Sequence, residues 1–130
     1  MKKKVLIIED DLVACRALQK RLAKAGIDVD CALDGEEGLA KSHNGYDCIL
    51  LDFALPTVDD WQVLNELKNY DGTKQTPVVI CSVLDDDDYR KQVESLGADG
   101  YVNIFHEDVL SEVEKILGGG HLKKSSPKAS

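Results

Sequence analysis

Short apolar runs alternate with longer amphipathic stretches along the chain, and this alternation predicts its secondary structure. Residues 48–51 and 78–81 are apolar without interruption, which is typical of strands buried on both faces of a parallel sheet. Residues 4–8 and 101–104 are further strand candidates. Residues 27–32 alternate apolar and acidic side chains, as expected of an edge strand with one wetter face.

Between the strands, apolar residues recur at the spacing of helices. The predicted helices are residues 12–25, 36–43, about 61–69, 85–96 and 108–117. The acids of residues 85–88 suit an N-cap and first helical turn, because carboxylates are stabilised at the positive end of the helix dipole. Five strand–helix alternations predict an α/β domain of the flavodoxin-like, doubly wound class, with five parallel strands in the order 2-1-3-4-5.

The length of 130 residues suits one domain, which we place at residues 1–117. Residues 118–130 begin with three glycines and show no apolar pattern, so we expect a flexible tail there. A formal net charge of -8 argues against a surface for nucleic acid or anionic lipid. No apolar stretch approaches the roughly 20 residues that span a bilayer, and we expect a cytoplasmic protein.

The four cysteines are scattered and match no metal-binding spacing, so we expect them to be reduced and mostly buried. The three histidines are far apart in the sequence, which disfavours a histidine-ligated metal.

Polar side chains stand where the predicted strands end. Glu9 and Asp10 follow the first strand, Asp52 ends the third with Pro56 four residues later, and Ser82 ends the fourth. Because ligands bind at the carboxyl ends of parallel strands, we expect these groups to converge. Clustered carboxylates repel one another unless a cation lies among them, and their hard oxygens suit Mg²⁺. A nucleotide or flavin site is disfavoured, because acids replace the Gly, Ser or Thr amides it needs after the first strand.

This ordered set of residues resembles the receiver domain of response regulators in two-component signalling, over about residues 4–117. The resemblance implies that Asp52 accepts a phosphoryl group from a phosphohistidine on a kinase or phosphotransfer protein. It implies that Asp10, Asp52 and the backbone carbonyl of Ala54 ligate Mg²⁺, with Glu9 acting through a metal-bound water. Ser82 would hydrogen-bond the phosphoryl group, and Tyr101 would move inward when it arrives.

The chain also departs from the receiver pattern. Receivers usually carry a Lys-Pro pair shortly after the fifth strand, whereas residues 101–106 contain neither lysine nor proline. Loss of that positive charge should weaken stabilisation of a dianionic phosphoryl group. Val83 is bulkier than the usual Ala or Gly, and Asp59-Asp60 replaces the usual loop glycine.

The sequence therefore leaves two interpretations of the function open. In the first, the chain is a phosphoryl-accepting signalling domain with a kinase and a downstream effector as partners, no direct contact with nucleic acid or membrane, and a monomeric or weakly dimeric state. It would not be an enzyme beyond the phosphorylation and slow dephosphorylation of its own Asp52. In the second, it is an atypical receiver that binds partners without phosphorylation. A phosphatase forming an acyl phosphate is disfavoured, because Ala54 interrupts the usual Asp-x-Asp arrangement.

Overall fold

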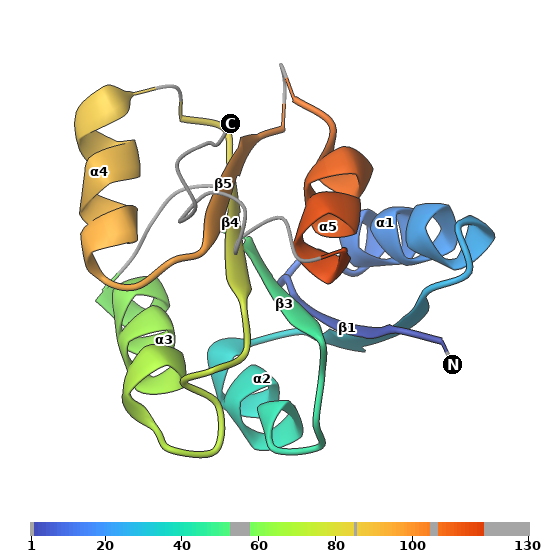
Figure 1. Cartoon of the computed structure of the whole chain (residues 1–130), viewed down its shortest axis with the longest axis horizontal. Helices are drawn as coiled ribbons and strands as arrows, with labels where there is room; N and C mark the ends of the chain where they lie inside the picture. Colours follow the sequence, from blue (N-terminus) through green and yellow to red (C-terminus); the bar gives the residue numbers. More distant parts are fainter. Residues whose placement is uncertain (1, 53–57, 85, 105–106, 119–130) are drawn as a thin grey trace.

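The computed structural model describes residues 2–52, 58–84, 86–104 and 107–118, which form one twisted parallel sheet flanked by helices (Figure 1). The strands are β1 (Lys4–Ile8), β2 (Asp28–Ala32), β3 (Cys48–Asp52), β4 (Val78–Ser82) and β5 (Gly100–Asn103). They lie in the order β2-β1-β3-β4-β5, and every neighbouring pair is parallel. The predicted flavodoxin-like class and strand order are confirmed.

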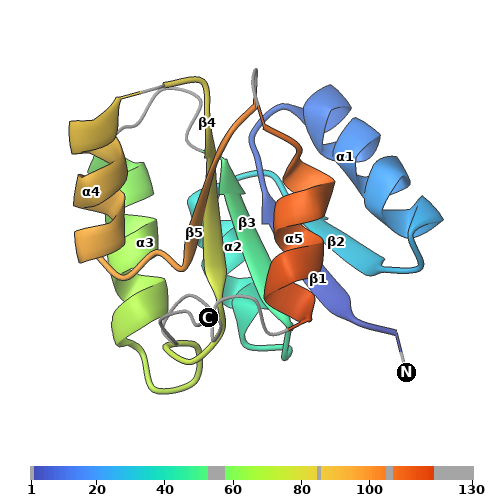
Figure 2. The same cartoon turned by 45° about the horizontal axis from the view of Figure 1, so that its top comes forward.

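Helices cover both faces of the sheet. They are α1 (Leu12–Lys24), α2 (Gly35–Ser42), α3 (Val58–Asn69), α4 (Asp87–Ser95) and α5 (Val109–Leu117). α1 and α5 lie on one face, and α2, α3 and α4 lie on the other (Figure 2). The carboxyl ends of the strands all point to the same edge, at the top of Figure 2.

Alternate strand residues fill two separate cores. Ile7 and Leu50 pack with α1 and α5, whereas Ile8 and Leu51 pack with α2, α3 and α4. Each is at most 4% exposed, and burial of such a side chain stabilises the fold by about 1.5–3 kcal/mol. The central strands are therefore fixed from both faces, which holds the residues at their carboxyl ends in place.

The acids at three helix starts act as caps. Asp11 accepts hydrogen bonds from the backbone N–H groups of Val13 and Ala14 at 2.9 and 3.3 Å, and Asp34 accepts from Glu37 at 2.7 Å. Asp86 accepts from the N–H of Asp88 at 2.8 Å, so it is the N-cap of α4. The prediction that the 85–88 run supplies the N-cap and first turn is thereby confirmed for residues 86–88, because Asp86 is the N-cap and Asp87 and Asp88 lie in the first turn.

A disulfide joins Cys15 of α1 to Cys31 of β2. The expectation that all four cysteines are reduced is therefore wrong for this pair, whereas Cys48 and Cys81 are free and buried. The two bonded cysteines are 16 positions apart in the sequence, so no local motif reveals the pairing. It arises because α1 packs back onto the edge strand that follows it.

Among the described residues, no helix has the length and apolar character needed to cross a membrane. The proposed tail lies outside the described residues from Gly119 onward, so its flexibility stays a prediction.

Candidate functional site

Three carboxyl side chains meet at the ends of β1 and β3. Ile8 pairs with Leu51 in the sheet, and the next residues along the two strands are Glu9 and Asp52. Asp52 and Asp10 lie close enough to Glu9 for both to raise the pKa of its carboxyl group. The structure thus brings together the three carboxylates that the sequence placed at the strand ends.

The environment of Glu9 favours the protonated form of its carboxyl group. Glu9 is only 9% exposed. Burial is the largest cause that raises the pKa of Glu9 from 4.5 to about 8, followed by the charge of Asp52 and the contact with Asp10. The cluster therefore retains a proton at neutral pH unless a cation displaces it.

Asp11 differs from its two acidic neighbours. Its carboxylate caps α1 through the two hydrogen bonds described above, so it has a structural role. Asp10 is exposed and lies between the buried Glu9 and this cap. Ala54, whose backbone carbonyl was the fourth expected ligand, lies outside the described residues.

The donor set suits a hard divalent cation. Carboxylate oxygens are the ligands that Mg²⁺ takes in proteins, usually together with several waters. Within the described ranges, no group of three or more His, Cys, Asp or Glu side chains is already arranged around a metal position. Glu9, Asp10 and Asp52 fit Mg²⁺ chemically, provided that the proton leaves the cluster when the ion enters.

Ser82 and Tyr101 lie beside this cluster on β4 and β5. Ser82 is fully buried, and its hydroxyl oxygen accepts a hydrogen bond from the N–H of Leu84 at 3.1 Å. Tyr101 is 5% exposed and donates its hydroxyl to the carbonyl oxygen of Leu84 at 2.6 Å. The guanidinium of Arg90 lies 4.4 Å from the centre of the Tyr101 ring. Tyr101 thus occupies an inward position, held by groups of the chain itself.

The residues near the expected lysine position differ in orientation. Asn103 is 2% exposed, and its side-chain amide donates to Leu84 O at 3.1 Å. Ile104 is 40% exposed. Asp52 pairs with Cys81 and Cys81 with Val102, so Ile104, two residues after Val102, falls on the face of the sheet that carries Asp52. Ile104 therefore corresponds best to the missing lysine.

Tyr89 is a polar residue of this region that the sequence analysis did not single out. It lies on α4, where it is 8% exposed, and its ring packs edge-on against both Trp61 and Tyr101. Its hydroxyl approaches that of Ser82. A signal was present: Tyr89 precedes the core residue Val93 by four positions, so both fall on the buried face of the helix.

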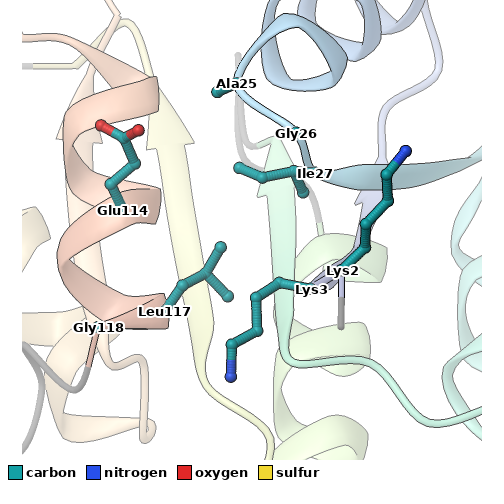
Figure 3. A pocket seen from close by; sticks show the side chains of 8 residues that line it. All are labelled: Lys2, Lys3, Ala25, Gly26, Ile27, Glu114, Leu117 and Gly118. Atoms are coloured by element: carbon teal, nitrogen blue, oxygen red, sulfur yellow. The ribbon is translucent and has the colours of Figure 1, made fainter.

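A separate hollow lies at the opposite edge of the sheet, away from the acidic cluster. It has a volume of about 680 Å³ and is bordered by the end of α5, the turn after α1 and the residues before β1. Ile27 and Leu117 face each other across it (Figure 3). None of the strand-end residues named above borders this hollow.

The strand order defines the flavodoxin-like fold class, and acidic side chains stand at the ends of β1 and β3. Residues 5–110 match the family model described as the response regulator receiver domain. The chain belongs to this family, and it is therefore a signalling domain of two-component systems.

Named relatives agree with this assignment. The chain is 34% identical over 126 residues to the transcriptional activator protein IrlR of Burkholderia pseudomallei (strain 1026b), covering 95% of this chain and 54% of that protein. It spans about half the length of the curated relatives it matches. A CheY-like receiver domain protein from Methanospirillum hungatei JF-1 superposes with a TM-score of 0.80 at 22% identity, covering 95% of this chain and 99% of that one. The BeF3-activated DrrB receiver domain gives a TM-score of 0.75 at 24% identity, with 91% and 99% covered.

Proposed function

We propose that this chain is a phosphoryl-accepting receiver domain in which Asp52 takes a phosphoryl group from a phosphohistidine. The observation that carries the proposal is the placement of Asp10 and Asp52 beside Glu9, whose pKa is raised by burial and by these two acids. A structural role alone does not explain it, because packed carboxylates cost stability unless they bind something.

In the proposed reaction, a carboxylate oxygen of Asp52 attacks the phosphorus atom while the bond to the donor histidine nitrogen breaks. The electron pair of that bond returns to the imidazole, which is then neutral or takes a proton. Bound Mg²⁺ supplies positive charge that stabilises the phosphoryl oxygens during transfer. Glu9, Asp10 and Asp52 would hold the ion, and Ser82 would donate a hydrogen bond to the transferred group.

The partners follow from this chemistry. A histidine kinase or histidine phosphotransfer protein supplies the phosphoryl group, and a downstream effector receives the signal. We place the domain in the cytoplasm, where such kinases present their phosphohistidine, and expect no direct contact with nucleic acid or membrane from this acidic chain. Its own activity is limited to phosphorylation and slow dephosphorylation of Asp52.

The alternative is an atypical receiver that binds partners without phosphorylation. Two observations favour it: Ile104 stands where a lysine is usual, and contacts with Leu84 and Arg90 already hold Tyr101 inward. In that case phosphorylation of Asp52 would not change the face formed by α4 and β5.

Incubation with acetyl phosphate and Mg²⁺, followed by mass spectrometry of the intact chain, tests the proposal. One added phosphoryl mass that disappears in Asp52→Asn is expected, and Asp10→Asn should slow its appearance by weakening Mg²⁺ binding. Glu66→Gln, an exposed change on α3, serves as the matched control. An unmodified wild-type chain would leave the phosphorylation-independent alternative.

A further inference from the structure

The hydroxyl of Tyr89 is enclosed by protein and lies near the Ser82 hydroxyl, but no hydrogen bond of normal geometry reaches it from the residues that the structure describes. Buried hydroxyl groups are nearly always paired, because an unpaired one loses its hydrogen bonds to water and gains nothing in return. A phenylalanine would fill the same space without that cost. The hydroxyl therefore suggests a partner that arrives with a ligand.

The surroundings of Tyr89 indicate where this partner would be. The ring centre lies 5.6 Å from that of Trp61 on α3 and 5.7 Å from that of Tyr101 on β5, with both pairs edge-on. The ring is thus fixed between two elements. Its hydroxyl approaches Ser82, the residue expected to hydrogen-bond the phosphoryl group.

Asp52 is also near. Its negative charge is among the causes that raise the pKa of the Tyr89 hydroxyl, of which burial is the largest. The phenol therefore keeps its proton at physiological pH and can act as a hydrogen-bond donor. Donation from a neutral hydroxyl to an anion is stronger than donation to a neutral acceptor.

We propose that Tyr89 is a phosphoryl-binding residue, whose hydroxyl donates a hydrogen bond to the phosphoryl group on Asp52 alongside Ser82. This inference rests on the proposed function of Asp52. It gives the chain a donor, supplied by α4, at a site where residues 101–106 supply no lysine. A tyrosine adds no positive charge, so it replaces the geometry of the lysine contact better than its electrostatics.

The proposed hydrogen bond would also connect the phosphoryl group on Asp52 to helix α4 at the protein surface. Tyr89 is the third residue of α4, and Arg90 beside it stacks on Tyr101. A hydrogen bond from Tyr89 to the phosphoryl group would draw the first turn of α4 toward β3. The phosphoryl group would then act on α4 directly.

Tyr89→Phe tests the idea, because it removes the hydroxyl and keeps the ring between Trp61 and Tyr101. Beryllium trifluoride, whose beryllium becomes tetrahedral when it bonds to an aspartate oxygen and so mimics a phosphoryl group, is the probe, titrated by calorimetry in Mg²⁺. We expect its affinity to fall about 10- to 100-fold, the usual loss for a hydrogen bond to a charged group. The affinity for Mg²⁺ alone should not change.

The same variant should become more stable in the absence of ligand, because an unpaired buried hydroxyl has been removed. A rise in melting temperature of about 5 °C is expected. Stronger folding together with weaker anion binding is a combination that loss of packing alone does not produce. Tyr46→Phe is the control: it removes a hydroxyl that donates to Asp30 at 2.6 Å, on the far side of β1, and should leave anion binding unchanged.

Unchanged affinity for beryllium trifluoride in Tyr89→Phe, with a wild type that binds it, would overturn the role of Tyr89 and leave Asp52 as the acceptor. A wild type that neither binds the probe nor takes a phosphoryl group would instead overturn the proposed function itself. The two failures are therefore distinguishable.

Discussion

Asn103 and Tyr101 share one hydrogen-bond acceptor, the carbonyl oxygen of Leu84. Both side chains lie on the same face of β5, and that face is thereby connected to the segment that leads from β4 into α4. Glu107 extends the connection, because it accepts from the N–H of Asn103 at 2.7 Å and lies 3.3 Å from the guanidinium of Arg90. The end of β5 is thus held by two hydrogen bonds to the Leu84 carbonyl, one to the Glu107 carboxylate and one ion pair, in a region where receivers usually place a lysine.

This arrangement predicts different effects for Ile104→Lys and Asn103→Lys, which the sequence alone does not distinguish. Ile104→Lys places a cation on the sheet face of Asp52, at an exposed position that tolerates charge. We expect it to raise the initial rate of phospho-Asp52 formation with acetyl phosphate and Mg²⁺ by on the order of tenfold. Stability should change little, which a thermal melt would check.

Asn103→Lys is the matched comparison. It removes a buried hydrogen bond to Leu84 and buries a charge, so it should cost more than about 2 kcal/mol of stability and give no increase in rate. If the lysine at 103 accelerates phosphorylation and the lysine at 104 does not, the assignment of Ile104 as the equivalent position is wrong.

The raised pKa of Glu9 predicts how stability depends on pH. A carboxyl group whose pKa is higher in the folded state binds more protons there, so the contribution of Glu9 to the free energy of unfolding is greatest below pH 4.5. That contribution is lost as pH rises from 4.5 to about 8, by on the order of 2–5 kcal/mol. Thermal melts of wild type and Glu9→Gln across this window measure the difference between them.

Glu9→Gln should flatten this dependence, whereas Glu94→Gln, an exposed change on α4, should not. Mg²⁺ should restore wild-type stability near pH 7.5, because it binds the ionised cluster and not the unfolded chain. Identical pH profiles for wild type and Glu9→Gln would show that Glu9 has an ordinary pKa.

The sequence was sufficient to predict the sheet and the acidic cluster for a physical reason. Strands buried on both faces leave uninterrupted apolar runs, so β3 and β4 are visible directly in residues 48–51 and 78–81. Parallel topology then places Glu9 next to Asp52 without further information. Element ends were less certain: β5 runs from Gly100 to Asn103, one residue earlier than expected, because Gly100 pairs with Val79.

Features that depend on packing between elements could not be predicted in this way. The Cys15–Cys31 disulfide requires a known distance between α1 and β2, and the cysteine spacing carries no trace of it. Tyr89 follows four acids, and this acidic run indicates the start of a helix but gives no sign of a role for the aromatic residue after it. Its neighbours Trp61 and Tyr101 belong to other elements, so the aromatic cluster appears only in three dimensions.

The disulfide should contribute measurably to stability. It closes a loop with a sequence separation of 16, for which the restriction of the unfolded chain is worth about 3 kcal/mol. Reductant should therefore lower the melting temperature of wild type by about 10 °C. Cys31→Ser should melt at a lower temperature than oxidised wild type and be insensitive to reductant. Equal melting of wild type with and without reductant, with thiol titration showing that the reductant has broken the Cys15–Cys31 bond, would contradict the prediction.

The last prediction concerns association through the face formed by α4, β5 and α5, where receivers resembling this one usually meet partners. Asp86, Asp87 and Asp88 are exposed at the start of this face. Arg90, Lys91 and Lys115 could neutralise them across a two-fold axis. Lys91 is exposed, whereas the other two are already engaged within the chain: Arg90 lies 3.3 Å from Glu107, and Lys115 lies 3.3 Å from Glu112.

Two copies brought together at this face would therefore repel, and salt would screen the repulsion. We expect sedimentation velocity to give a monomer or weak dimer at low salt and tighter association at moderate salt. Asp87→Asn with Asp88→Asn should strengthen association at low salt and reduce its salt dependence. Asp71→Asn with Glu66→Gln removes the same charge from exposed positions at the end of α3 and beyond it, and should not. A tight dimer at every salt concentration, unaffected by either pair of substitutions, would mean that contacts other than these acids control assembly.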